Sequence, residues 1–164
     1  MTIASQPKTD NGVVRAVVDI AASPEDVFKA LTDSRELAAW LGGVDDYTPG
    51  GWNDDAAPGM AWRSPAIAPD GTRGTVRGEL LVVDAPRRIV TTWHASWDHF
   101  ARTLVRYELA PTDVNGVPGT RLTVTHTAPA AYLQHVSHFG ALRDGGWTAL
   151  LARLSRLMSE RLTV

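Results

Sequence analysis

An apolar stripe near the C-terminus constrains the fold more than any other feature of the sequence. After Gly146, large apolar residues recur at offsets of 3, 4, 7, 10 and 11 from the first of them, at Trp147, Leu150, Leu151, Leu154, Leu157 and Met158. This period predicts an amphipathic helix with one broad apolar face. Because such a face must be buried, the rest of the chain has to supply a second apolar layer. The arginines at this end fall mainly off the stripe, where we expect them to meet water: Arg153, Arg156 and Arg161.

The preceding sequence predicts strands that supply this layer. Residues 13–20 alternate between apolar and polar, with one apolar face made by Val14, Ala16, Val18 and Ile20. Further strands are expected at 59–66, 72–83, 88–97, 102–110 and 121–127. Turn signals separate most of them, such as Asp70-Gly71, Asp98-His99 and a loop rich in Gly and Pro at 111–119. Strands joined by such short turns form antiparallel hairpins.

Two short helices are expected between the first and second of these strands. Ser23-Pro24-Glu25-Asp26 combines an N-cap residue, a proline at the first helical position and acidic residues in the first turn. A second helix is expected from Ser34, burying Leu37, Trp40 and Leu41 before Gly42-Gly43 ends it. This element order predicts an α+β fold, in which a curved antiparallel sheet of about six strands wraps around the long C-terminal helix. We expect a tapering cavity between the two.

Composition limits the possible partners and chemistry. The chain has 164 residues, which predicts a single domain at 13–164 after a flexible lead at 1–12. A net charge of −2 and no block of Lys or Arg argue against nucleic acid and against an anionic membrane surface. The lack of cysteine excludes disulfides and thiolate chemistry. With no apolar segment of signal or membrane-spanning type, and with arginine far in excess of lysine, we expect a cytoplasmic bacterial protein.

Four segments of the sequence resemble a known family. They are IAASPEDVFKALTD at 20–33 with LAAWLG at 37–42, GELLVVDAPRRIVTTW at 78–93, GTRLTVTH at 119–126, and Gly146-Trp147 followed by the leucine stripe. In this order they are similar to the START-related helix-grip (SRPBCC) superfamily. Within it they resemble the AHSA1-like branch, named after the activator of Hsp90 ATPase. The resemblance runs from about Val13 to Leu157.

The resemblance implies a helix-grip fold with a cavity for an apolar ligand, and no shared catalytic residue. Members of the superfamily include binders of lipids and hormones, polyketide aromatases and cyclases, and co-chaperone domains, so the fold alone does not select a function. The stretch 42–58 departs from the family pattern because it is longer and more acidic, which puts the shape of the pocket mouth in question.

Six tryptophans, at 40, 52, 62, 93, 97 and 147, are the most unusual feature of the composition. Trp62, Trp93 and Trp147 are predicted to face inward, with Trp40 near the mouth. They predict either a flat cavity that stacks on an aromatic ligand or a core filled by bulky side chains. The expected ligand-binding residues are Trp40, Trp62, Ile89, Thr91, Trp93, Val105, Tyr107, Leu122, Val124, His126, Trp147, Leu150, Leu151 and Leu154.

Three polar residues are candidates for proton transfer. His126 is predicted on the inward face of the last strand, within reach of Tyr107 on its neighbour. The pair would hydrogen-bond a ligand carbonyl or phenol, or His126 would act as a general acid or base. The alternative is a buried neutral histidine that bonds the tyrosine or a backbone carbonyl. Glu79 is a base or polar anchor if it faces the cavity, and an ordinary surface residue if it faces water.

No metal site and no cofactor are expected. A pair of histidines at i, i+3 lacks a third ligand, and the acidic loop pairs lack the spacing of a calcium site: His135 and His138, Asp45-Asp46 and Asp54-Asp55. The sequence has no nucleophile elbow, no zinc-protease motif, no Walker loop and no dinucleotide fingerprint.

Three functions follow as hypotheses. The first is binding of a small hydrophobic molecule, aromatic or polycyclic, between the sheet and the C-terminal helix. The second is an aromatase/cyclase or lyase acting on a polyketide-like substrate, with His126, Tyr107 or Glu79 transferring protons. The third is a stress or chaperone-accessory interaction module with a chaperone as partner. We expect a monomer or a homodimer in each case.

Overall fold

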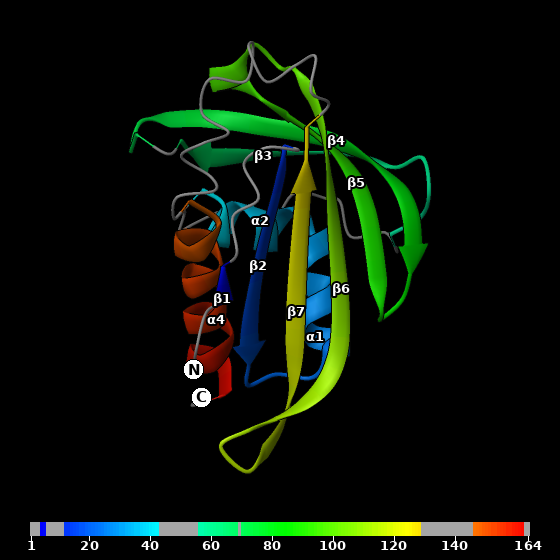
Figure 1. The fold of residues 1–164 in the computed structure, drawn as a ribbon, viewed down its shortest axis with the longest axis vertical. Helices are drawn as coiled ribbons and strands as arrows, with labels where there is room; N and C mark the ends of the chain where they lie inside the picture. Colours follow the sequence, from blue (N-terminus) through cyan, green and yellow to red (C-terminus); the bar gives the residue numbers. More distant parts are fainter. Residues whose placement is uncertain (1–3, 6–11, 43–55, 69, 129–145, 163–164) are drawn as a thin grey trace.

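A seven-stranded antiparallel sheet forms the body of the protein. In this computed structural model the described residues are 4–5, 12–42, 56–68, 70–128 and 146–162. The strands follow the order β1-β2-β7-β6-β5-β4-β3 across the sheet (Figure 1). Their bounds are β1 Ala4–Ser5, β2 Val13–Ile20, β3 Ala61–Ile67, β4 Arg73–Asp84, β5 Arg88–Ala95, β6 Arg102–Val114 and β7 Val117–Thr127. All neighbouring strands are antiparallel. Besides the strands predicted from the sequence, β1 pairs with the outer edge of β2.

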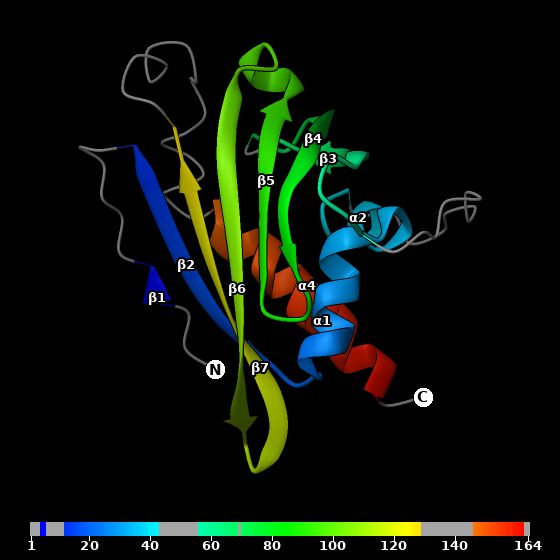
Figure 2. The same cartoon turned by 90° about the vertical axis from the view of Figure 1, so that its right-hand side faces the viewer.

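The helices lie together on one side of this sheet. They are α1 (Pro24–Thr32), α2 (Ser34–Trp40) and α4 (Trp147–Leu162). Figure 2 shows the sheet curving past α4. α2 packs against β3, and α1 contacts β6 and β7. The predicted start of α1 is confirmed, since the Ser23 hydroxyl accepts a hydrogen bond from the Asp26 amide at 3.2 Å. The predicted α+β helix-grip fold is therefore confirmed.

The core lies between the concave face of the sheet and the helices. Alternate residues of every long strand are buried, as the 2-residue period predicts. On β2 these are the four residues predicted from the sequence, each at 1% exposure or less. The stripe of α4 supplies the opposite side, where Leu151 and Leu154 are completely buried. α4 also contacts α2 and β2, so it connects the helices with the β2 side of the sheet.

Three local predictions differ from the structure. The strand expected to run to Trp97 ends at Ala95, and a 3-10 helix, η2 (Ser96–Asp98), follows. The Ser96 hydroxyl accepts a hydrogen bond from the Thr75 amide at 3.0 Å, which takes the place of the ladder beyond Ala95. Trp97 consequently leaves the inward row of β5 and packs over Gly74.

The second difference is the loop expected at 111–119. β6 and β7 continue through it and turn at Asn115-Gly116, where both residues have positive φ values of 52° and 83°. This is the conformation that a two-residue hairpin turn requires. The ribbon projects beyond the rest of the sheet (Figure 1), so its prolines, Pro111 and Pro118, do not interrupt a ladder to a third strand.

The third difference concerns Arg153. Its guanidinium is half-buried and donates to the backbone carbonyls of Trp40 at 3.1 Å and Leu41 at 3.4 Å. These carbonyls lie at the C-terminal end of α2, where they have no partner within the helix. Arg153 therefore joins two helices instead of simply meeting water.

Candidate functional site

All fourteen residues expected to bind a ligand are buried. The least buried of them, Trp62 and Leu150, are each 7% exposed. They come from α2, β3, β5, β6, β7 and α4, so residues far apart in the sequence meet on the concave side of the sheet.

Five of these residues form a group that we call the interior aromatic cluster: Trp62, Trp93, Tyr107, His126 and Trp147. The ring centroid of Trp93 lies 5.9 Å from that of Trp62, 5.5 Å from His126 and 5.3 Å from Trp147. Trp147 also lies 6.3 Å from Tyr107 and 5.9 Å from His126. Most of these pairs meet edge to face, the arrangement that the aromatic quadrupole favours. Trp93 and Trp147, which each contact three of the other rings, therefore form the centre of the cluster.

Both ring nitrogens of His126 are engaged in hydrogen bonds. The Trp147 indole N–H donates to His126 Nδ1 at 3.0 Å, and His126 Nε2 lies 2.7 Å from the Thr103 hydroxyl oxygen. Because an indole nitrogen only donates, Nδ1 carries no proton and Nε2 carries one. The Nε2–H group then donates to Thr103, whose own hydroxyl donates to the Trp93 carbonyl at 3.1 Å. A directed chain of hydrogen bonds thus joins α4 to β7, β6 and β5.

This arrangement selects the neutral form of His126. Its side chain is 1% exposed, and burial lowers its pKa from 6.5 to about 3. The sequence allowed a neutral histidine bonded to a tyrosine or a carbonyl, whereas the partners observed are a threonine and an indole. Tyr107 lies beside His126 in the register, opposite Val124, and burial raises the pKa of its phenol.

The indole N–H groups of the cluster differ in how they are satisfied. Trp62 donates to the Thr91 hydroxyl at 2.7 Å, and Trp147 donates to His126. The Nε1 atom of Trp93 is buried and has no hydrogen-bond partner among the described residues. Leaving a buried donor unpaired costs about 1–3 kcal/mol. One of the two central rings of the cluster therefore carries a polar group that has no partner among these residues.

The other tryptophans lie outside this cluster. Trp40 is completely buried, and its indole N–H donates to the Ala30 carbonyl at 2.9 Å, which ties α2 to α1. Trp97 is half-buried in η2. Some predictions lie outside the described residues: Trp52, the acidic pairs Asp45-Asp46 and Asp54-Asp55, the histidines His135 and His138, and most of the 42–58 loop.

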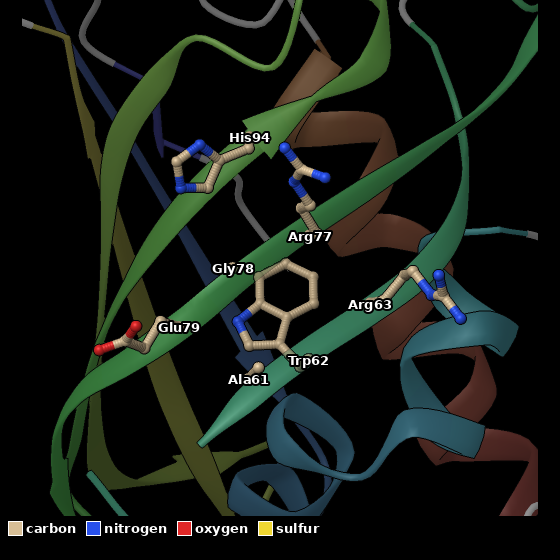
Figure 3. A pocket seen from close by; sticks show the side chains of 7 residues that line it. All are labelled: Ala61, Trp62, Arg63, Arg77, Gly78, Glu79 and His94. Atoms are coloured by element: carbon tan, nitrogen blue, oxygen red, sulfur yellow. The ribbon is translucent and has the colours of Figure 1, made fainter. Parts of the chain in front are cut away.

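Glu79 lies on the outer face of the sheet. It is exposed, while its neighbours on β4, Gly78 and Leu80, face inward. Glu79 lines an open groove of about 580 Å³ together with Ala61, Trp62, Arg63, Arg77, Gly78 and His94 (Figure 3). The basic residues of this groove were not predicted from the sequence to form a site. Strand alternation places them on the outer face, but only the strand register reveals that they are neighbours.

The described residues contain no group of three or more His, Asp or Glu side chains arranged to hold a metal ion. No helix within them combines the length and the apolar character needed to cross a bilayer.

Comparison with known proteins places the chain in a family. No curated protein matches the sequence. The structure is similar to that of protein Ms6760 from Mycobacterium smegmatis, with 20% identity, a TM-score of 0.69, and coverage of 96% of this chain and 97% of the other. An AHSA1 protein from Silicibacter pomeroyi is 23% identical with a TM-score of 0.61, over 91% and 99% of the two chains. DynU16, described as a protein of the dynemicin biosynthetic locus, is 23% identical with a TM-score of 0.61, over 91% of this chain and 48% of the other.

These structures share the fold of this chain, and the family follows from the sequence. The family model for activator of Hsp90 ATPase homolog 1-like proteins matches residues 21–159, which include α1, α2, strands β3 to β7 and most of α4. The resemblance found in the sequence is thereby confirmed, and the chain belongs to the activator of Hsp90 ATPase homolog 1-like family of helix-grip proteins.

Proposed function

We propose that the protein binds a small, flat aromatic molecule with one hydrogen-bond acceptor, against the interior aromatic cluster between the sheet and α4. The cluster supports this proposal by its chemistry. It gathers three indoles, a phenol and a neutral imidazole on the concave side of the sheet, and none of them carries a charge. Aromatic contacts of this kind are worth about 0.5–1.5 kcal/mol per pair beyond the area they bury.

The single observation that carries the proposal is the unused N–H of Trp93. It lies on the ring that contacts Trp62, His126 and Trp147, and it has no acceptor among the described residues. A carbonyl, ether or phenol oxygen on a ligand would accept this hydrogen bond and remove the cost of the unpaired donor. The proposed ligand therefore combines an apolar ring system with one oxygen acceptor at its edge.

Proton transfer by His126, Tyr107 or Glu79 stays a prediction that no observation here favours. A histidine with a pKa of about 3 is a weak base at neutral pH, and both of its ring nitrogens already have partners. Burial raises the pKa of Tyr107, and Glu79 lies on the outer face of the sheet. The role of a chaperone accessory likewise stays a prediction.

The test uses two ligands that differ only in the acceptor. Isothermal titration calorimetry compares 2-acetylnaphthalene, whose ketone accepts a hydrogen bond, with 2-ethylnaphthalene, which has none. We expect the ketone to bind about three- to tenfold more tightly to the native protein, because one added hydrogen bond contributes about 0.5–1.5 kcal/mol. Trp93→Phe keeps most of the ring but removes the donor, so the preference for the ketone should vanish.

Trp97→Phe is the matched control. Trp97 also has a buried N–H without a partner among the described residues, but it lies in η2, outside the interior aromatic cluster. This variant should keep the preference for the ketone. The proposal fails if neither naphthalene binds saturably, or if Trp93→Phe retains the full preference. Melting temperatures of both variants verify that they fold.

A further inference from the structure

A row of basic side chains crosses the outer face of the sheet. Arg63 on β3 pairs in register with Arg77 on β4, Arg77 pairs with His94 on β5, and His94 pairs with Arg102 on β6. All four belong to the outward-facing positions of their strands. Residues directly opposite one another on antiparallel strands have Cβ atoms about 4.5–5.5 Å apart, and like charges at this distance repel. Arg63 and Arg77 therefore place two positive charges directly opposite each other, at a cost to stability.

Among the described residues, no carboxylate forms an ion pair with this row. The four ion pairs among them use other arginines, namely Arg35, Arg87, Arg106 and Arg121. Glu79 lines the same groove but forms no ion pair with Arg63 or Arg77. Arg63 and Arg77 are exposed cross-strand neighbours that form no ion pair with a described carboxylate, so their guanidinium groups are available as the donors of an anion site.

A strained turn holds one of these guanidinium groups in place. Arg77 lies with its Cζ atom 4.3 Å from the centroid of the Phe100 ring, a cation–π contact. Phe100 is 37% exposed and has a φ of 57°, which is uncommon for a bulky residue, and His99 before it has a φ of 55°. His94 helps to hold this turn, since its Nδ1 lies 3.0 Å from the Phe100 carbonyl oxygen. Strain of this kind gathers at functional sites.

The Trp62 indole lines the same groove as the two arginines. The pairing of β4 with β5 is interrupted between the pairs Arg77/His94 and Leu80/Thr91. In this gap the Thr92 hydroxyl accepts a hydrogen bond from the Glu79 amide. The indole of Trp62 packs on Gly78 at this point, because a Cβ at Gly78 would lie 2.7 Å from the ring. Figure 3 shows this ring among the lining residues, with Glu79 on one side, Arg63 on the other, and Arg77 and His94 above it in the view.

The two arginines also separate two hollows. The larger, about 580 Å³, contains Trp62 and Gly78, and the smaller, about 350 Å³, contains Phe100. Arg63 and Arg77 line both. A ligand in the larger hollow would thus place a ring beside Trp62 and its edge within reach of both guanidinium groups.

From this we infer that the outer groove binds a small aromatic carboxylate, with the acid group on Arg63 and Arg77 and the ring beside Trp62 and Gly78. This groove shares Trp62 with the interior aromatic cluster. The two arginines that would hold the acid group lie outside the cluster, so the inference does not depend on the function proposed for it. Charge complementarity selects the anion, and the planar guanidinium fork matches the two oxygens of a carboxylate.

The test measures 2-naphthoate binding by isothermal titration calorimetry at low ionic strength. We expect Arg63→Gln and Arg77→Gln each to weaken binding by about tenfold or more, the size of a lost charge-assisted hydrogen bond. Arg63→Gln should melt at or above the native temperature, because it removes a like-charge contact. Arg77→Gln also removes the cation–π contact with Phe100, so its melting temperature serves only to verify that the variant folds. Arg15→Gln is the matched control: Arg15 is also exposed, but it lies on β2 at the far end of the sheet, and binding should stay within about twofold.

Two further measurements separate this site from other modes of binding. The uncharged 2-naphthamide should bind at least about tenfold more weakly than 2-naphthoate. Trp93→Phe, which tests the interior site, should leave 2-naphthoate binding unchanged. The inference is overturned if 2-naphthoate shows no saturable binding up to about 5 mM, if the amide binds equally well, or if Arg15→Gln loses as much affinity as Arg77→Gln. An equal loss in Trp93→Phe would assign the ligand to the interior and overturn it as well.

Discussion

Replacing His126 by glutamine should make the protein less sensitive to mild acid, because a large part of the native protein's loss of stability there comes from His126. His126 titrates near 6.5 in the unfolded chain, and burial lowers its pKa to about 3 in the folded protein. Between these values the unfolded state binds a proton that the folded state does not, so acid favours unfolding. The contribution of His126 is fully present above pH 6.5 and is lost progressively as the pH falls toward 3. Glutamine does not titrate, and it retains both a donor for Thr103 and an acceptor for Trp147.

The magnitude follows from the two pKa values. At pH 5 the unfolded histidine is almost entirely protonated, and linkage gives a loss of about 2 kcal/mol relative to pH 7.5. For a domain of this size that corresponds to a fall in melting temperature of roughly 4–8 °C. The carboxyls of Asp19 and Asp33, whose pKa values are lowered chiefly by hydrogen bonds to Arg121 and Arg35, add their own acid sensitivity. They are the same in both proteins, so their effect cancels in the comparison.

Urea unfolding at pH 7.5, 6.5, 5.5 and 5.0, followed by far-ultraviolet circular dichroism, measures this difference. The native protein should lose about 2 kcal/mol more than His126→Gln across the series. His99→Asn is the control, because His99 is exposed in a left-handed turn that asparagine tolerates. If the native protein and His126→Gln lose the same stability, His126 gains a proton in the folded state and its hydrogen-bond chain has been assigned wrongly.

Two further substitutions test the packing. Gly78→Ala should destabilise the protein by about 3 kcal/mol or more, because the new methyl group collides with the Thr92 carbonyl oxygen; Thr75→Ala on the same strand is exposed and should cost far less in the same urea measurement. Leu151→Ala should cost about 2–5 kcal/mol, since it empties a completely buried position on α4. Ala152→Ser, on the exposed side of that helix, should change the unfolding free energy by less than about 0.5 kcal/mol, and an equal loss in both would mean that α4 is not packed as described.

Much of the fold follows from local patterns in the sequence. The stripe from Trp147 to Met158 predicted α4, and the alternation on β2 predicted which of its residues are buried. Ser23 with Pro24 predicted the start of α1, and its capping bond is present. Such predictions succeed because a period of 3.6 or 2 is a property of neighbouring residues, and burial then selects one face.

The turn at Asn115-Gly116 shows where local signals were misjudged. This dipeptide favours a tight hairpin, but the surrounding prolines and glycines favoured an irregular loop. The prolines are accommodated because the ribbon formed by β6 and β7 extends past its neighbours, where the unpaired edges need no donor. Only the lengths of the adjacent strands decide this, and no local pattern encodes them.

The sequence by itself determined the class of fold, the inward faces of the strands and helix, and the family. Tertiary structure decided which inward residues touch and which outward residues are neighbours. His126 meets Thr103 and Trp147, which are 23 and 21 positions away in the chain, and Arg63 meets Arg77 through the register of β3 and β4. The unused N–H of Trp93 and the close approach at Gly78 have the same origin. Periodicity specifies the direction of a side chain, whereas the pairing of distant segments specifies its partners, and the chemistry of both proposed sites depends on those partners.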